Sequence, residues 1–273
     1  MRFRHEKVIG GKGEASDQFL HTLTGIAVDT RDHIYAVGDS EAKVYDSEGR
    51  LKRSWATNQP GFSITVDEQT VYVGEEGQIE IFEGIGGLLR SWKDPALLGR
   101  VTAIGLIDDY VLIADTRARC IRRFDLEGSF LNNIGDTNRM KGFNIPNGAL
   151  DFAIDGHGVI HACNPGKHRV EQYMPDGELL GHIGRFDGRD PEGFPGCCNP
   201  TNVTVTDEGF LYVTEKAGPR AKVLDRKGNL IGVIATTVFD PNCKNMDVAV
   251  DSRGWVYVAD TVKLQINVFV PEG

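Results

Sequence analysis

The stretch DVAVDSRGWVYVAD, residues 247–260, decides the fold. Apolar residues alternate with small or polar ones in DVAV, WVYVAD is an apolar run that ends in Asp, and a turn containing Asp, Ser and Gly separates the two runs. A period of two is typical of β-strands rather than helices. The stretch therefore predicts two antiparallel strands joined by a tight turn.

The same unit recurs along the whole chain. Five further copies are GIAVDTRDHIYAVGD (25–39), SITVDEQTVYVGE (63–75), AIGLIDDYVLIAD (103–115), DFAIDGHGVIHACN (151–164) and NVTVTDEGFLYVTE (202–215). Five of the copies continue into a third and a fourth strand, such as HRVEQYMPDG and ELLGHIG at 168–184. Four strands repeated every 40–50 residues or so are typical of propeller blades. The sequence predicts an all-β, six-bladed β-propeller that forms a single domain over residues 1–273.

The sixth copy stops after its third strand, at Gly273. The segment HEKVIGG, residues 5–11, resembles the fourth strands of the other copies. We therefore expect the N-terminal strand to pair with the strand around 264–270 and close the last blade. Closure would remove the free edges that a sheet otherwise exposes.

Two segments resemble NHL repeats. GKHRVEQYMPDGELLGHIG (166–184) is similar to the third and fourth strands of that repeat, and VYVAD (256–260) to its second. The segment GFPGCCNPTNV (193–203) resembles a group of bacterial NHL-repeat proteins with a Cys-Cys-Asn-Pro motif. The resemblance implies a propeller and names no activity. An NHL-type amidating lyase binds zinc through histidines at its strand openings, but Asn147 stands where such a histidine would be expected.

Composition narrows the class of partner. The formal net charge is −9, which argues against a nucleic-acid partner, because phosphate binding needs a cationic surface. No apolar run approaches the roughly 20 residues that span a bilayer, so we expect no membrane span. The N-terminus has no apolar signal segment, and a cytoplasmic protein and an exported one with its signal removed both remain open.

The cysteines suggest a site at one mouth of the propeller channel. Five residues before the first aligned apolar position, the six copies carry His21, Gln59, Gly99, Asn147, Cys198 and Cys243. Cys198, Cys243 and His21 thus fall in neighbouring blades, and Cys197 precedes Cys198. Thiolate and imidazole ligands suit zinc or an iron–sulfur cluster. Inert packed thiols, and a disulfide such as Cys198–Cys243 or a redox-active thiol, are the alternatives.

Two loops between second and third strands, NPGKHR (164–169) and EKAGPR (215–220), fall on the same face. Their cationic side chains suit an anionic ligand, although solvated loops would have the same composition. The predicted ligand-binding residues are Asn147, Asn164, Lys167, His168, Arg169, Lys216 and Arg220. A residue with a carboxylate or amide side chain ends the second strand of every copy, and this recurrence predicts a structural capping role.

The leading functional hypothesis is a binding scaffold that takes a protein or small-molecule ligand on this mouth. The alternative is a metal-dependent enzyme of lyase or hydrolase type, or a redox subunit, that uses the Cys and His side chains.

Overall fold

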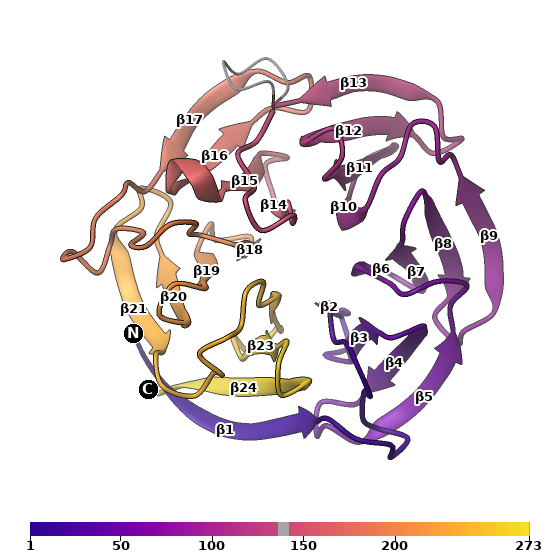
Figure 1. Cartoon of the computed structure of the whole chain (residues 1–273), viewed down its shortest axis with the longest axis horizontal. Coiled ribbons are helices and arrows are strands. Elements are labelled where there is room, and N and C mark those ends of the chain that lie inside the picture. Colours follow the sequence, from indigo (N-terminus) through magenta and orange to yellow (C-terminus); the bar gives the residue numbers. More distant parts are fainter. Residues whose placement is uncertain (136–141, 273) are drawn as a thin grey trace.

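The computed structural model describes residues 1–135 and 142–272. They form six four-stranded antiparallel sheets arranged as blades around a central axis (Figure 1). This confirms the predicted six-bladed β-propeller. Each of the first five repeats supplies one blade, because its four short strands are joined by tight turns that let each strand pair with the next, and the sixth repeat supplies three strands of its blade.

The first three blades follow the chain in order. Blade 1 holds β2 (Gly25–Val28), β3 (Ile34–Gly38), β4 (Glu41–Tyr45) and β5 (Leu51–Ala56). Blade 2 holds β6 (Ser63–Asp67), β7 (Thr70–Gly74), β8 (Gln78–Glu83) and β9 (Leu88–Lys93). Blade 3 holds β10 (Val101–Ile107), β11 (Tyr110–Asp115), β12 (Cys120–Asp125) and β13 (Phe130–Ile134).

The other three blades complete the ring. Blade 4 holds β14 (Phe152–Ile154), β15 (Ile160–Asn164), β16 (Arg169–Tyr173) and β17 (Leu179–Ile183), with a 3₁₀ turn, η1 (Pro165–Lys167), between β15 and β16. Blade 5 holds β18 (Asn202–Val205), β19 (Leu211–Glu215), β20 (Arg220–Leu224) and β21 (Leu230–Ala235). Blade 6 combines β22 (Val248–Val250), β23 (Val256–Asp260) and β24 (Gln265–Glu272) with the N-terminal β1 (Arg2–Gly10).

The N-terminal strand closes the ring as predicted. β1 pairs with β24 in antiparallel register, from Arg2 opposite Glu272 to Gly10 opposite Gln265. Figure 1 shows the indigo first strand lying outside the yellow last strand. The strand begins at Arg2, three residues before the predicted start, because the alternation continues through RFR.

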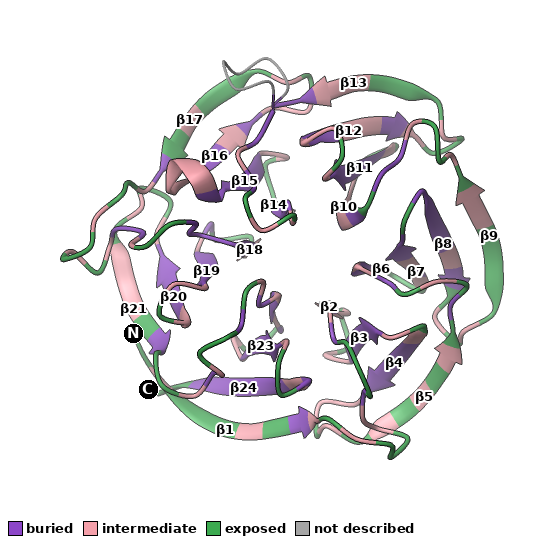
Figure 2. Cartoon of the chain, viewed as in Figure 1, coloured by how far each residue is buried: buried purple, intermediate pink, exposed green. Residues whose placement is uncertain are grey.

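The apolar core is divided among the blade interfaces. Six clusters of buried apolar residues occur in the described chain, one between each pair of neighbouring blades. Trp55 of blade 1 packs on Phe82 of blade 2, and Trp92 of blade 2 on Phe124 of blade 3, with ring centroids 5.7 and 4.8 Å apart. Figure 2 shows that the second and third strands of the blades are mostly buried and that the outermost strands are largely exposed. The blades therefore stabilise one another through side-by-side packing of their faces.

In the described residues, no helix has the length and apolar character needed to cross a bilayer.

Candidate functional site

The connections between blades and the loops between second and third strands lie on the same face, because the strands of each blade alternate in direction. The side chains that end the second strands tie these two sets of loops together. Asp39 accepts hydrogen bonds from the backbone N–H groups of Leu20, His21 and Thr22 at 2.8–3.0 Å. Although burial alone would raise it, these donors hold the pKa of Asp39 below its usual value. The side chain that ends this second strand therefore has a structural role, and it ties down the loop that precedes blade 1.

The same arrangement recurs in other blades. Asp260 accepts from the N–H groups of Asp240 and Lys263, both at 2.8 Å, and Asn164 accepts from the N–H of Asn144 at 3.0 Å. These bonds give the mouth of the channel a rigid rim.

A pocket of about 270 Å³ opens at this mouth. Every blade contributes to its wall, and one lining residue from each is Thr22, Phe62, Arg100, Asn147, Asn202 and Lys244. None of the described residues that line it has a carboxylate side chain. The pocket is therefore a joint product of the ring rather than of any single blade.

The pocket wall is cationic and polar. Lys244 is exposed, and among the described residues it has no carboxylate within ion-pair distance of its Nζ. The guanidinium of Arg100 lies 4.6 Å from the centre of the Phe62 ring and only 3.6 Å from a Glu76 carboxylate oxygen. Nearby, Lys216 Nζ donates to Asn147 Oδ1 at 2.5 Å. The wall thus carries two cations: Lys244 has no carboxylate partner among the described residues, and Arg100 shares its charge with the exposed Glu76.

Three amide side chains of the pocket have buried atoms without a hydrogen-bond partner among the described residues. They are Nδ2 of Asn147 and the Oδ1 atoms of Asn202 and Asn245. Buried polar atoms are nearly always hydrogen-bonded in folded proteins. Unpartnered donors and acceptors on one pocket wall therefore indicate a place where a ligand or ordered water would bind.

Of the seven predicted ligand-binding residues, two lie at this pocket. Asn147 lines it and Lys216 contacts Asn147. The structure pairs the other cations within their own blades. Lys167 and Arg169 lie 3.2 and 2.5 Å from Glu171 Oε1, and Arg220 lies 2.7 Å from Glu215 Oε1.

The remaining two predicted residues serve the η1 turn. His168 caps η1 in the left-handed conformation, with φ of 57°, and its ring contacts Phe186 at 4.9 Å between centroids. Asn164 precedes the turn and binds the preceding loop through the bond described above. Loop composition does not show which carboxylates the blade folds against these cations, and a ligand-binding role for them stays a prediction.

The predicted metal ligands are not gathered in one place. Cys198 Sγ donates to Cys197 Sγ at 3.2 Å, whereas Cys243 Sγ donates to Asp260 Oδ1 in its own blade at 3.1 Å. His21 is exposed. All five cysteines are free thiols, so the alternative Cys198–Cys243 disulfide is not formed. Within the described residues, no three His, Cys, Asp or Glu side chains are grouped so that they could hold a metal ion.

In four blades a residue one position after the predicted ring lines the pocket, and Asn147 of the ring itself lines it as well. The prediction took the residues five before the first apolar position, which include Gly99 and Cys243. The residues one position later, Arg100 and Lys244, line the pocket instead. The sequence shows both cations, but the spacing of the repeats does not determine which residues of an irregular loop face the pocket.

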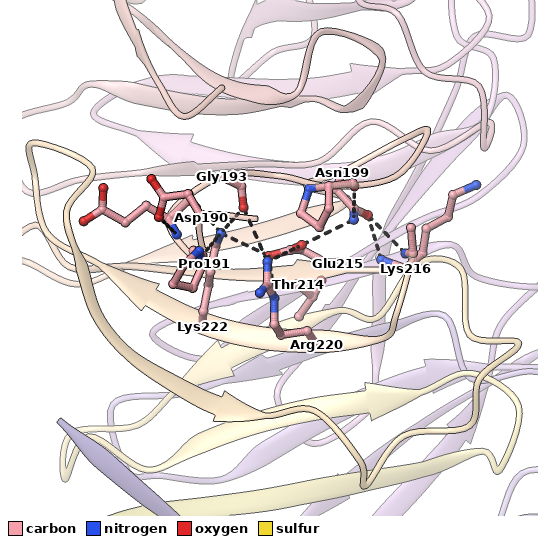
Figure 3. Close-up of polar contacts among 12 residues, drawn as sticks. Asp190, Pro191, Gly193, Asn199, Thr214, Glu215, Lys216, Arg220 and Lys222 are labelled. Atoms are coloured by element: carbon pink, nitrogen blue, oxygen red, sulfur yellow. Dashed lines mark hydrogen bonds and ion pairs between the residues drawn. The ribbon is translucent and has the colours of Figure 1, made fainter. Parts of the chain in front are cut away.

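The loop between β17 and β18 carries the adjacent cysteines and is held by blade 5. Lys222 of β20 has a fully buried side chain, and its Nζ donates to the carbonyl oxygens of Pro191, Glu192 and Gly193 at 2.7–3.1 Å (Figure 3). The same Nζ lies 3.1 Å from Glu215 Oε1. Burial lowers the pKa of Lys222 to about 8, even though the Glu215 charge opposes the shift.

Beyond Lys222, Asn199 fixes the end of this loop. Its Nδ2 donates to the carbonyl of Pro195 at 2.8 Å, and its Oδ1 accepts from the N–H of Lys216 at 2.8 Å. Figure 3 shows Asn199 between the loop and the end of β19. Asn199 thereby fixes the position of the Cys197–Cys198 pair relative to Lys216.

Sequence reasoning missed a second polar group, deeper in the channel. Asp151 Oδ2 accepts from the N–H of Val203 at 2.8 Å, and Asp247 Oδ2 from the N–H of Ile26 at 2.7 Å. Both carboxylates also bind the side chain of Asn202, and all three residues border the channel or its mouth. The sequence does carry a sign of this group at the first position of the six repeats. That position is Gly, Ser and Ala in the first three blades but Asp, Asn and Asp in the last three.

Burial shifts the ionisation of these carboxylates. It raises the pKa of Asp247 to about 6. Burial, and then the nearby Asp247 charge, raise the pKa of Asp151 well above its usual value. Asp247 is half-buried and lines the channel. The inner end of the channel therefore favours protonated carboxyl groups over an ionised pair.

Comparison with known proteins bears on the fold. No family model matches the chain, and no curated protein matches it. Solved structures do resemble it. A protein of unknown function from Bacteroides thetaiotaomicron is 15% identical with a TM-score of 0.71, over 95% of this chain and 72% of that one.

Two further solved structures have comparable likeness. The WD40 repeats of RRP9 are 11% identical with a TM-score of 0.67, over 98% of this chain and 97% of that one. Virginiamycin B lyase from Staphylococcus aureus is 10% identical with a TM-score of 0.63, over 99% of this chain and all of that one. At these identities the likeness is one of fold alone: this chain is similar to a range of β-propellers.

Proposed function

We propose that the protein is a binding scaffold that takes an anionic group in the pocket at the channel mouth. The observation that carries the proposal is the joint pocket itself, lined by all six blades and by the cations Arg100 and Lys244. Propeller architecture suits this role, because the ring places one residue from every blade around a single opening.

The chemistry of the wall supports an anion. Carboxylate and phosphate oxygens accept hydrogen bonds from guanidinium and ammonium groups, and these charge-assisted bonds are the stronger ones. The unpartnered Nδ2 of Asn147 adds a neutral donor to the same wall. At about 270 Å³ the pocket falls just below the range of roughly 300–1,000 Å³ that holds drug-sized ligands. It suits a small anion, or the acidic side chain or carboxyl terminus of a protein partner.

The repeat segments 166–184 and 256–260 support placing the chain among NHL-type propellers. The unbroken ring of blades supports a single domain over residues 1–273. Both inferences are compatible with a binding role and neither names the ligand.

Matched pairs of charged and neutral compounds test the proposal. Thermal unfolding is followed with succinate against succinamide, and with a tetra-glutamate peptide against its tetra-glutamine counterpart. We expect an anionic member to raise the melting temperature in a concentration-dependent way, as any ligand of the native state does. In the Arg100→Gln, Lys244→Gln double variant we expect that shift to disappear. Equal shifts from charged and neutral members, or a shift that survives the double variant, would contradict it.

A further inference from the structure

The adjacent thiols near the mouth differ from each other in environment. Cys197 is exposed, whereas Cys198 is buried with 4% of its surface accessible. Their sulfurs are 3.2 Å apart, with Cys198 donating and Cys197 accepting. One sulfur is therefore reachable from solvent while the second lies directly behind it.

Charge favours the thiolate at the outer sulfur. The hydrogen bond from Cys198, and then the positive charge of Lys216, hold the pKa of Cys197 below its ordinary value. Burial raises the pKa of Cys198, which suits its role as the donor. An accessible thiolate beside a cation is the arrangement that makes a cysteine a nucleophile.

The surrounding bonds keep this arrangement in place. Asn199, directly after the pair, binds the backbone N–H of Lys216, and Lys216 Nζ binds Asn147. Lys222 holds the preceding part of the loop through three carbonyl oxygens. The pair therefore sits on a loop anchored at both sides.

We propose that Cys197 and Cys198 form a dithiol site that reacts with small-molecule disulfides, with Cys197 as the attacking sulfur and Cys198 as the resolving one. In the first step the Cys197 thiolate attacks one sulfur of a disulfide RSSR, which forms a Cys197–S–SR mixed disulfide and releases RS⁻. In the second step Cys198 gives up its proton and attacks Cys197 Sγ, which forms the Cys197–Cys198 disulfide and releases the second RS⁻. The protein dithiol loses two electrons and RSSR gains them, so the products are one protein disulfide and two thiols.

The spacing of the two residues makes the oxidised form easy to reduce. Consecutive Cα atoms are about 3.8 Å apart, whereas disulfide-bonded cysteines usually have Cα atoms roughly 4.4–6.8 Å apart. A ring between neighbours is therefore strained, and strained disulfides are the labile ones that react reversibly. The substrate class is a small disulfide, with the corresponding thiol as the reductant of the return reaction.

The test uses the full-length reduced protein and the uncharged probe 2,2′-dithiodipyridine, which releases one thiopyridone for each exchange step. For the native wild type we expect two thiopyridones per chain and a product lighter by two hydrogens, with peptide mapping placing the bond between Cys197 and Cys198. Cys120, Cys163 and Cys243 are buried and serve as internal controls that should react only after denaturation.

Substitutions separate the roles of the two sulfurs. We expect Cys198→Ser to release one thiopyridone and to keep a stable mixed disulfide on Cys197. Cys197→Ser should slow the native reaction at least about tenfold, because the buried thiol has neither the access nor the thiolate character. The circular dichroism of each variant establishes that it is folded.

Lys216 is tested as a positioning residue. Lys216→Gln should slow the first release without lowering the melting temperature by a comparable degree, and Lys216→Arg should restore the rate. Lys227→Gln removes a cation from an exposed turn and should leave the rate unchanged.

Three outcomes would overturn the proposal: a wild type that stops at the mixed disulfide, a Cys197→Ser variant that reacts as fast as wild type, or a pair that reacts only after unfolding. No mouth ligand is involved in this assay, so its failure and that of the anion-binding proposal are distinguishable.

Discussion

Lys222 illustrates how a single charged residue can organise a loop. Its ammonium group is bound by three carbonyl oxygens and the Glu215 carboxylate in place of water. The same group lies 4.1 Å from the centre of the Phe194 ring. Lys43 occupies the equivalent strand of blade 1 and is 2% exposed. It donates to the carbonyl of Ser16 in the loop before that blade at 2.8 Å. In both blades a third-strand lysine fastens the preceding connection.

We expect Lys222→Met to lower the free energy of unfolding by about 3–5 kcal/mol, because removing one partner of a buried pair leaves Glu215 and the loop carbonyls unpaired. Urea unfolding at neutral pH measures the change. Lys227→Met, in an exposed turn, is the matched control and should change it by less than about 0.5 kcal/mol. Equal stability of the Lys222 variant and the wild type would show that the ammonium group does not hold the loop.

These lysines mark the limit of residue-level prediction. Both stand in alternating segments, AKVY at 42–45 and AKVL at 221–224, so the sequence predicts the strand. A lysine in such a strand is normally read as facing solvent. It is buried here because a long connection folds back over the sheet, and nothing in the local pattern shows that return.

At the scale of elements, β1 is the strand on which ring closure depends. It covers the edge of β24 along Arg2–Gly10 and contributes Ile9, which is 2% exposed, to the cluster between blades 6 and 1. The sequence predicted this pairing because one copy of the repeat lacks its fourth strand. Counting the strands of each copy is enough to show this, without knowledge of how the side chains pack. The residues of the mouth were harder to predict, because connections between blades vary in length and carry no period.

We expect deletion of residues 1–11 to cause aggregation or a large fall in melting temperature, because it exposes the edge of β24 and opens one apolar cluster. Light scattering and thermal unfolding measure the outcome. A synthetic peptide of residues 1–11 should restore part of the stability by adding back the strand, and a scrambled peptide should not. Unchanged melting of the truncated chain would contradict the role of β1.

At the scale of the whole molecule, neighbouring blades are also joined by hydrogen bonds along the channel wall. Asp151 of the loop before β14 binds the backbone of blade 5, and Asp247 of the loop before β22 binds that of blade 1. Each carboxylate therefore spans a blade interface from the inside. Because both groups lie in the same narrow channel, ionising both costs free energy in the folded state.

The raised pKa of Asp247 gives a pH dependence with a defined sign. Its pKa is about 6 in the folded protein and about 3.9 in an unfolded chain, so the folded state holds its proton more tightly. The stabilisation is fully present below about pH 4 and is lost as the pH rises to about 6, by up to about 3 kcal/mol.

Asp247→Asn should remove this loss while keeping an oxygen acceptor for the Ile26 N–H. Urea unfolding at pH 4 and pH 7.5 should therefore show a smaller difference for the variant than for the wild type. Asp207→Asn, at an exposed position, is the control and should behave as wild type. An identical pH difference in Asp247→Asn and wild type would contradict the assignment.

The pairing of β1 with β24 also means that the first strand to be synthesised pairs with the last. At roughly 5–20 residues per second, the ribosome would deliver β1 some 10–50 seconds before its partner strand exists. Throughout that interval β1 has no sheet to join. Its sequence, RFRHEKVIG, places charged side chains at Arg2, Arg4, Glu6 and Lys7, and charges of this kind discourage an unpaired strand from joining the wrong edge. The strand that completes the ring thus also has a charged composition that protects it from mispairing while it is unpaired.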